Sequence, residues 1–480
     1  MSNYKKLGKN SLMVFLGNFG SKAIVFLMLP FYTRFLTPEN YGDLDIITTI
    51  IALVTPLVTL AMSEAVFRLP KNQSKEVQGE YFTTGLVASL GGLILFGLFY
   101  VIFFKFMGNI FQEHALMVYL ILMIGFLFGY LQQFTRSLDR MDIYVSTGII
   151  YTFFFAGLNI ILIKKYGFSG YLTSMLVTQI LVVLYLIFRV EFRDYFNIKK
   201  FSKKRLKEIL EYTIPLIPTA TVWWIMNLSD RLILKYYHGG EVVGYYAVAN
   251  KFPILIATIF GIFFISWQMS AIDEHAKENF EEFYNNLFKM ISGILNLCNI
   301  GLILVIYPVM KILVSDNYFD SWKLVPILSL GIIYSNLASF IGVNYVAFKK
   351  TKGALYTAGF GALVNVVLNF ILIPKYSVLG ACIATMVAYI SLFIFRKIQI
   401  DKMVYLHFEF SKMFFDIIIN ILIYGTVILK ISLVYKIFLV TFFVSLYIYT
   451  NREYIEKTFD IIREKMVFKI LKKRGENGER

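Results

Sequence analysis

The chain has 480 residues, of which 58% are hydrophobic and 16% are charged, and its formal net charge is +16. A soluble domain carries about 25% charged residues, and a soluble chain of this length divides into several cores joined by polar linkers, which this sequence lacks. The composition therefore excludes a soluble globular protein. The positive charge is interpreted as membrane topology and attraction to anionic lipid rather than nucleic-acid binding.

Apolar runs of about 20 residues recur along the chain, which is the length of helix that crosses a hydrocarbon layer about 30 Å thick. Runs such as 116–131 do not alternate as barrel strands do, so the sequence predicts helices. The least regular run contains Asn250, Lys251 and Gln268. Fourteen spans are predicted, at 11–35, 44–69, 82–104, 115–137, 143–163, 168–189, 211–235, 243–270, 287–307, 324–348, 354–373, 378–396, 411–429 and 432–450.

The basic residues predict the orientation of these spans, because Lys and Arg are retained on the cytoplasmic side. With the N-terminus inside, 34 of the 47 basic residues fall on that side and 10 fall outside. Both termini and the basic connection 190–210 are therefore predicted to be cytoplasmic. The tail 452–480 has apolar residues at helical spacing, and two interpretations stay open: a helix on the inner membrane surface, or a solvated basic tail.

The sequence offers no sign of an enzyme or of a bound cofactor. Cys298 and Cys382 lie inside apolar runs, and the four histidines have no metal-ligand spacing. A phosphate-binding loop and a nucleophile elbow are both missing. We therefore expect a protein that is not an enzyme and that needs no cofactor or metal.

An internal repeat divides the chain. Residues 158–170 (LNIILIKKYGFSG) and 368–380 (LNFILIPKYSVLG) match without gaps at an offset of 210 residues, with eight of thirteen positions identical. Six predicted spans separate the copies, so the two halves share one orientation, as in parallel transporter repeats. The sequence predicts an all-α polytopic membrane protein with two pseudo-symmetric six-helix lobes at 1–200 and 201–405, two additional helices at 406–451, and the tail at 452–480.

Residues 369–381 (NFILIPKYSVLGA) resemble the polysaccharide transporters, a branch of the multidrug/oligosaccharidyl-lipid/polysaccharide exporter superfamily. Residues 18–46, 138–144 and 229–252 are similar to the same family. The resemblance implies a flippase that moves an undecaprenyl-pyrophosphate-linked oligosaccharide across a bacterial cytoplasmic membrane by alternating access. It also implies partners among the polymerase and glycosyltransferases of the same pathway, and coupling to a proton or sodium gradient is expected.

Such a cargo is anionic, so cationic residues at membrane depth are the first candidates for binding it, because a charge there is costly without a function. Lys22 lies midway along the first span, on one face with Asn18. Lys251 and Arg231 lie within later spans. The candidate binding residues are Lys22, Asn18, Arg231, Lys251, Asn227 and Trp223, and the candidates for ion coupling are Glu64 and Asp230.

Each candidate also has a structural interpretation. Lys22 could pair with a carboxylate or snorkel to the interface, and Trp223 could be an interfacial anchor. At the level of function, a lipid II-type flippase and a drug or metabolite exporter of the same superfamily stay open. A membrane glycosyltransferase would need paired acidic residues in a large outside loop, and the outside loops are short. A non-transporting scaffold would not explain the polar helix faces.

Overall fold

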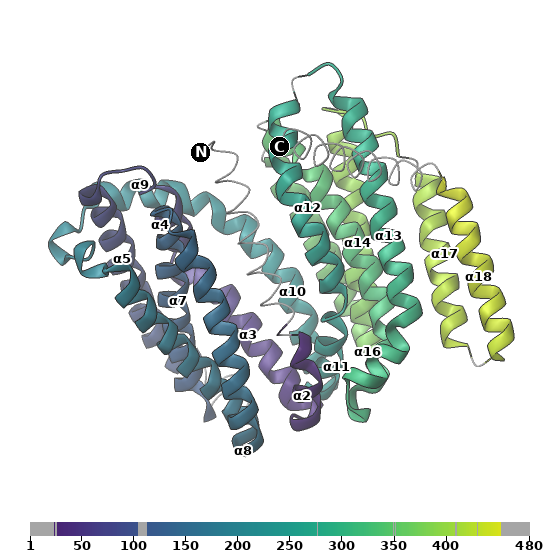
Figure 1. The fold of residues 1–480 in the computed structure, drawn as a ribbon, viewed down its shortest axis with the longest axis horizontal. Coiled ribbons are helices and arrows are strands. Elements are labelled where there is room, and N and C mark those ends of the chain that lie inside the picture. The colour runs from purple at the N-terminus through teal and green to yellow at the C-terminus, as the bar shows by residue number, and fades with distance from the viewer. Residues whose placement is uncertain are drawn as a thin grey trace, which may run out of the picture. The chain divides into compact units, whose positions relative to one another are not determined.

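The computed structural model describes residues 24, 26–103, 113–275, 277–348, 350, 352–408, 410–429 and 431–452. Within these residues all regular secondary structure is helical (Figure 1). The chain divides into two compact units. The first comprises Met1–Gly244 with Leu313–Tyr318, and the second comprises Tyr245–Ile312 with Phe319–Arg480.

The first unit is built from long apolar helices joined by short polar turns, and a short helix, α9, follows its most basic connection. Its helices are α2 (Leu29–Phe35), α3 (Pro38–Val58), α4 (Met62–Arg68), α5 (Lys75–Phe103), α7 (Ala115–Ser137), α8 (Met141–Val190), η2 (Phe192–Asp194), η3 (Ile198–Lys200), α9 (Lys203–Thr213), η4 (Ile214–Leu216) and α10 (Ile217–His238). Helix α11 (Gly240–Asn250) begins in this unit and continues into the second.

The second unit is likewise built largely from long apolar helices, and it includes the two helices at the end of the described chain. Its helices are α12 (Pro253–Glu274), α13 (Phe280–Leu313), η5 (Asp316–Leu324), α14 (Val325–Gly342), α15 (Asn344–Ala347), α16 (Lys352–Ile400), α17 (Phe410–Ile428) and α18 (Leu433–Thr450). Helix α13 reaches the first unit at its last residue, and η5 divides between the units at Tyr318.

Helices α8 and α16 are each a pair of antiparallel helices. In α8 the hydroxyls of Ser146 and Tyr185 lie 3.3 Å apart, and in α16 Nε of Arg396 donates to the hydroxyl of Thr357 at 3.2 Å. Residues 39 positions apart in one straight helix would be about 60 Å apart. Each element therefore contains two membrane spans joined at a sharp turn, as the predicted spans 143–163 with 168–189 and 354–373 with 378–396 require.

The two hairpin turns have the same geometry at the same repeat position. Gly167 has φ 52° and ψ −123°, and Ser377, 210 residues later, has φ 51° and ψ −132°. Three residues after each turn a glycine lies against the preceding helix. A Cβ on Gly170 would overlap the carbonyl oxygen of Leu162, and one on Gly380 would overlap that of Leu372. The two copies of the repeat thus have the same turn geometry and the same close glycine contact at matching positions.

Among the described residues, ten helices are long and apolar enough to cross a membrane. Two of the ten, α8 and α16, contain two spans each. Helix α10 corresponds to a further predicted span, and most of the first predicted span lies outside the described residues. The prediction of an all-α polytopic fold with about fourteen spans is confirmed.

Two predicted spans are broken in the structure. The span 44–69 begins earlier, at Pro38, where Thr37 caps the helix by accepting a hydrogen bond from the backbone of Asn40, and it breaks where Leu60 and Ala61 have positive φ. The span 243–270 divides into α11 and α12 directly before Pro253. Proline lacks an N–H and disfavours helix at the preceding residue, which explains the second break.

Buried amides attach the additional helices to the second unit. The side-chain amide of Asn299 on α13 donates to Oδ1 of Asn420 on α17 at 2.8 Å. Nδ2 of Asn451, which caps α18, donates to the carboxylate of Asp416 at 3.0 Å. Hydrogen bonds between helices commonly stabilise helix association within a membrane, because moving apolar side chains from lipid into a helix interface gains little free energy. Figure 1 shows α17 and α18 side by side, joined at one end by a short turn.

Candidate functional site

Two ion pairs join α3 to α10 in the first unit. Nε of Arg231 lies 2.5 Å from Oδ2 of Asp45, and Nζ of Lys235 lies 2.5 Å from Oδ1 of Asp43. The two cations are one helical turn apart on α10, and the two carboxylates are two residues apart near the start of α3. The four residues form an ion-pair cluster that holds these two helices together.

The cluster is largely buried, so its members depend on one another. The side chain of Asp43 is 1% exposed, and those of Arg231 and Asp45 are each 12% exposed. The second carboxylate oxygen of Asp43 has no hydrogen-bond partner among the described residues. Removing one partner of a buried pair leaves an uncompensated charge, which costs about 3–5 kcal/mol. The contact is therefore stable only while both helices contribute their side chains.

Beside the cluster, the starts of α3 and α11 are in backbone contact. A Cβ on Gly42 would overlap the carbonyl oxygen of Gly240, and one on Gly244 would overlap that of Pro38. Glycines therefore allow the two chain segments to approach as closely as they do. In the sequence, the turns 37–42 and 237–244 both have a Glu followed three residues later by a Gly, and this shared spacing predicts that they are matching positions that meet. The structure confirms their proximity.

A third segment packs onto the same place. The hydroxyl of Ser315 donates to the carbonyl of Thr33 at 2.6 Å, and the hydroxyl of Tyr318 donates to that of Leu36 at 2.9 Å. The rings of Tyr318 and Tyr41 meet edge to face, with centroids 6.1 Å apart. Together with the ion-pair cluster and the glycine contact, this packing forms what we term the junction. It brings together segments from near residues 33–45, 231–244 and 315–318.

The predicted site residues fall in different places. Arg231 belongs to the junction, where it also donates to the backbone carbonyl of Asn227. Asp230, next to it on α10, is buried. Lys251 lies half-buried at the break between α11 and α12, and Glu64 is exposed on α4.

The remaining predicted residues are described less fully. Trp223 lies on α10, but its side chain is outside the description, and Lys22 and Asn18 lie outside the described residues. The binding and ion-coupling roles of all these residues stay predictions. Among the described residues, no group of three His, Cys, Asp or Glu side chains could hold a metal ion.

Sequence reasoning missed Asp43, Asp45 and Lys235. The predicted span 44–69 left Asp43 outside the helix and Asp45 at its start, and the span 211–235 ended at Lys235, so all three charges lay at span ends, where charges are unremarkable. The signal that could have corrected this was Thr37–Pro38, since a capping threonine before a proline is typical of a helix start. With the helix begun there, both aspartates fall well inside α3.

A second polar cluster lies in the second unit and includes one of the repeat asparagines. The amide of Asn369 donates to Oδ1 of Asn365 at 3.1 Å. Asn365 in turn lies 3.4 Å from the hydroxyl of Thr385, which also faces the hydroxyl of Tyr246 at 3.4 Å. In the first unit the equivalent asparagine, Asn159, donates to the hydroxyl of Tyr32 at 2.9 Å. Both repeat asparagines are therefore buried hydrogen-bonding positions.

At one end of the first unit, three connections predicted to be cytoplasmic enclose a polar cavity of about 580 Å³. Lys75 and Asp194 form an ion pair of 2.5 Å within this group of residues. Basic and acidic side chains are balanced in the lining, so the cavity has no strong preference for an anion. Its charged lining residues are Lys75, Asp139, Arg140, Arg189, Glu191 and Asp194.

Comparisons with known proteins agree with this architecture. The family described as polysaccharide biosynthesis protein matches residues 7–267. A capsular polysaccharide biosynthesis protein, CapF of Staphylococcus aureus, is 25% identical over 408 residues, which cover 81% of this chain and 99% of CapF. The Lsg locus putative protein 1 of Haemophilus influenzae is 22% identical over 268 residues, covering 52% of this chain and 62% of that protein.

Solved structures show the same fold. The lipid II flippase MurJ, in an inward closed conformation, superposes with a TM-score of 0.67 at 20% identity, covering 91% of this chain and 99% of MurJ. An inward-facing multidrug resistance transporter of the MATE family superposes with a TM-score of 0.61 at 15% identity, covering 80% of this chain and 95% of that one.

Proposed function

Because the chain belongs to the polysaccharide biosynthesis protein family, we propose that it is a flippase for an undecaprenyl-pyrophosphate-linked oligosaccharide, the repeat unit of a surface polysaccharide. The family match, which covers more than half of the chain, is the observation that carries the proposal. The similarity to a capsular polysaccharide biosynthesis protein along 99% of that protein supports it. The protein would act in the bacterial cytoplasmic membrane, with both termini inside, alongside the polymerase and glycosyltransferases of its pathway.

In this proposal the junction is one end of the transport path in its closed form. Cargo passes only after the ion-pair cluster separates and α3 moves away from α10. Separation releases Arg231 from Asp45, and its guanidinium can then pair with a cargo pyrophosphate. Exchange of one anion for another lowers the cost of opening, because the buried cation is never left without a partner.

The other predicted residues have complementary roles in the proposal. Lys22 and Lys251 supply further positive charge to the pyrophosphate, Asn18 and Asn227 donate hydrogen bonds, and Trp223 stacks on a sugar ring. The protein is not proposed to be an enzyme and requires no cofactor.

Transport would be driven by a proton or sodium gradient. Glu64 and Asp230 are the candidates for coupling that the sequence suggests. Asp43 joins them, because one oxygen of its buried carboxylate has no hydrogen-bond partner among the described residues.

A lipid II-type precursor is the second candidate cargo. It is favoured by the superposition on MurJ, which covers 91% of this chain. Both cargoes carry a pyrophosphate, so the residues proposed to bind that group serve either one.

Deletion of the gene in its native host, followed by mass analysis of lipid-linked intermediates, tests the proposal. We expect a complete undecaprenyl-linked repeat unit to accumulate and the surface polysaccharide to be lost. The wild-type gene and the exposed variant Arg193→Ala should restore the polysaccharide, and Arg231→Ala should not. Accumulation of a peptidoglycan precursor would identify the second cargo, and unchanged lipid-linked pools would refute a flippase of either kind.

A further inference from the structure

Helix α9 has two contrasting faces. Its sequence, KKRLKEILEYT, turns Ile209 and Thr213 inward, where both are buried. Next to them around the helix, Leu206 and Leu210 are one turn apart and only partly covered, and Ile214 directly after the helix is 52% exposed. Lys203 and Lys207 are also one turn apart and exposed beside this apolar stripe. An exposed apolar stripe flanked by lysines is typical of a helix that lies on a membrane surface.

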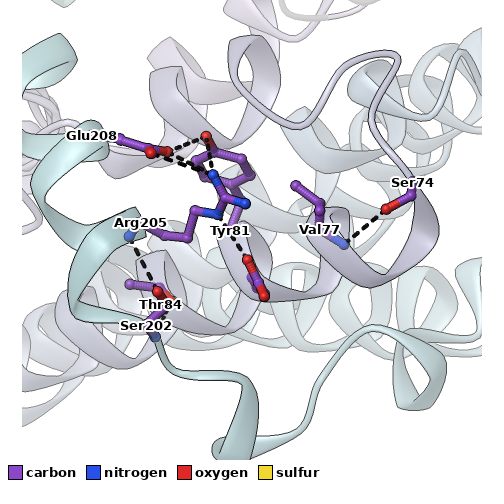
Figure 2. Close-up of polar contacts among 8 residues, drawn as sticks. Ser74, Val77, Tyr81, Thr84, Ser202, Arg205 and Glu208 are labelled. Atoms are coloured by element: carbon purple, nitrogen blue, oxygen red, sulfur yellow. Dashed lines mark hydrogen bonds and ion pairs between the residues drawn. The ribbon is translucent and has the colours of Figure 1, made fainter.

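The inner face of α9 is fixed to the first turns of α5. The guanidinium of Arg205 donates to Glu80 at 2.8 Å and to Glu208 at 3.0 Å, and it also approaches the hydroxyl of Tyr81 at 3.3 Å. Figure 2 shows Arg205 between Tyr81 and Glu208. The hydrogen bond from Tyr81, and then Arg205, lower the pKa of the Glu208 carboxyl. The Glu208 carboxylate therefore stays ionised at neutral pH, and its contacts with Arg205 and Tyr81 hold α9 in one orientation.

Backbone contacts extend this attachment. The backbone N–H of Ser202, which caps α9, donates to the hydroxyl of Thr84 at 3.0 Å. The N–H of Asn197 donates to the hydroxyl of Thr83 at 3.3 Å. The connection before α9 is therefore attached to α5 as well, and the outer face of α9 cannot rotate inward to hide its apolar side chains.

The attachment also sets the height of α9 relative to the membrane. The residues of α5 that hold it, from Glu80 to Thr84, lie where the charged start of that helix gives way to a largely apolar run, from Leu86 to Phe103, that carries no charged residue. That transition marks the boundary between headgroups and hydrocarbon. Helix α9 is therefore held at the level of the lipid headgroups, on the side predicted to be cytoplasmic.

An apolar groove with a volume of about 600 Å³ lies along the outer face of α9. Its floor and walls are apolar side chains, and its charged rim has two lysines and one glutamate. The groove is lined by Phe201, Lys203, Leu206, Lys207, Leu210, Glu211, Ile214 and Pro215.

We propose that this face of α9 is a binding site for anionic phospholipid, with an acyl chain in the groove and the headgroup phosphate on Lys203 and Lys207. The lysines match a phosphate in charge, and the apolar groove matches a chain that extends from the membrane. The site is distinct from the residues proposed to bind cargo, and it does not depend on which cargo is carried. It lies on the connection 190–210, which the sequence predicts to be cytoplasmic.

Fluorescence quenching in reconstituted vesicles tests this proposal. In a full-length chain with Cys298→Ser and Cys382→Ala, Leu210→Cys carries a bimane label. The vesicles contain phosphatidylcholine and phosphatidylglycerol, and one of the two lipids at a time carries bromine on its acyl chains. Brominated phosphatidylglycerol should quench the label more than its share of the lipid. A lysine at a membrane surface is worth about fivefold in affinity for anionic lipid, so the preference should fall severalfold in Lys203→Gln/Lys207→Gln.

The matched control removes two lysines from another connection predicted to be cytoplasmic. Lys350→Gln/Lys352→Gln, both exposed, should keep the full preference. Soluble glycerol phosphate should not reverse the quenching, because it lacks the acyl chain. Equal quenching by both lipids would overturn headgroup recognition. Quenching by neither would show that a protein partner or water covers this face, and would overturn the proposal. A label at Leu206→Cys repeats the measurement should Leu210→Cys fail to fold.

Discussion

At the scale of single residues, burial distinguishes ion pairs on which the stability of the fold depends from ion pairs that contribute little to it. Asp43 and Lys235 approach to 2.5 Å with the carboxylate 1% exposed. Asp320 and Lys323 approach to 2.6 Å, but with side chains 81% and 48% exposed. Water screens the second pair almost completely, so exposed pairs contribute about 0–1 kcal/mol. Similar distances thus predict different consequences of mutation.

Lys235→Met should destabilise the protein strongly, because it leaves the Asp43 carboxylate buried without its cation. We expect a loss of about 3–5 kcal/mol, measured as a lower melting temperature of the purified protein in detergent. The double variant Asp43→Leu/Lys235→Met should recover most of this loss, because both charges are then removed together.

The exposed pair supplies the control. Lys323→Met should change stability by less than about 1 kcal/mol. Two outcomes would show that the buried pair does not hold α3 to α10. One is a Lys235→Met protein with the melting temperature of the wild type, and the other is a double variant no more stable than the single one.

The sequence indicated which single residue is important, but it did not indicate the residue with which it forms an ion pair. Arg231 was recognisable because a cation inside an apolar run is costly. Its partner Asp45 is 186 positions away, and no periodicity within a single helix indicates a pairing at that distance. Prediction of Asp43 failed for a local reason, since the start of α3 was placed six residues late.

At the scale of elements, the two hairpins differ at one informative position. A backbone near φ 50° and ψ −125° suits glycine, which has no Cβ, and strains other residues. The first hairpin has Gly167 at this place and the second has Ser377. The repeat therefore contains a natural comparison between a relaxed turn and a strained one.

Ser377→Gly should stabilise the protein, and Gly167→Ala should destabilise it, each by about 1–3 kcal/mol. The reason is the same in both cases, because only the Cβ at the turn changes. Thermal unfolding of the two variants beside the wild type measures both effects.

A control separates the turn from the general effect of glycine in a helix. Gly359→Ala, on the same element as Ser377 but with open space around its Cβ position, should be neutral or mildly stabilising. If Ser377→Gly lowers the melting temperature, the serine is not strained and makes a contact that the turn needs.

The elements themselves were largely predictable. Apolar length fixes a span, and the polar residues between spans 5 and 6 marked the first hairpin turn. The break at Leu60 and Ala61 was not predictable, because ordinary apolar residues adopt the positive φ there. The break before Pro253 did have a signal in the proline, although the apolar residues on both sides concealed it.

At the scale of the whole molecule, the junction makes a strong prediction about transport. A Cβ at Gly240 would lie 3.0 Å from Cγ of Glu39. Cysteines at Glu39 and Gly240, in a chain without Cys298 and Cys382, should therefore form a disulfide on oxidation. If the junction must open, the disulfide should stop transport, and reduction should restore it.

The control disulfide joins two residues within a single hairpin. A Cβ at Gly361 would lie 3.2 Å from Cβ of Leu392, and both residues are on α16, so cysteines there should also form a disulfide but leave transport unchanged. Lipid-linked intermediates in whole cells provide the measurement for both pairs. Full transport with the Glu39–Gly240 disulfide formed would show that the junction stays closed throughout the cycle.

The fold was more predictable than the site for a physical reason. The length of each apolar run and the 210-residue repeat can both be recognised in the sequence without knowledge of any three-dimensional contact. The junction depends on three segments from distant parts of the sequence meeting at one place. The matching Glu and Gly spacing of the turns 37–42 and 237–244 was the one sequence signal that linked two of them.

The hairpins also constrain how the protein is made. A turn as tight as those at Gly167 and Ser377 leaves no loop that could be threaded separately across a bilayer. The two helices of each hairpin must therefore leave the translocation channel together, as one insertion event. With the orientation predicted from the basic residues, this joint insertion also moves Lys164, Lys165 and Lys375 across the membrane. The apolar helices on both sides of each turn offset the cost of translocating those charges.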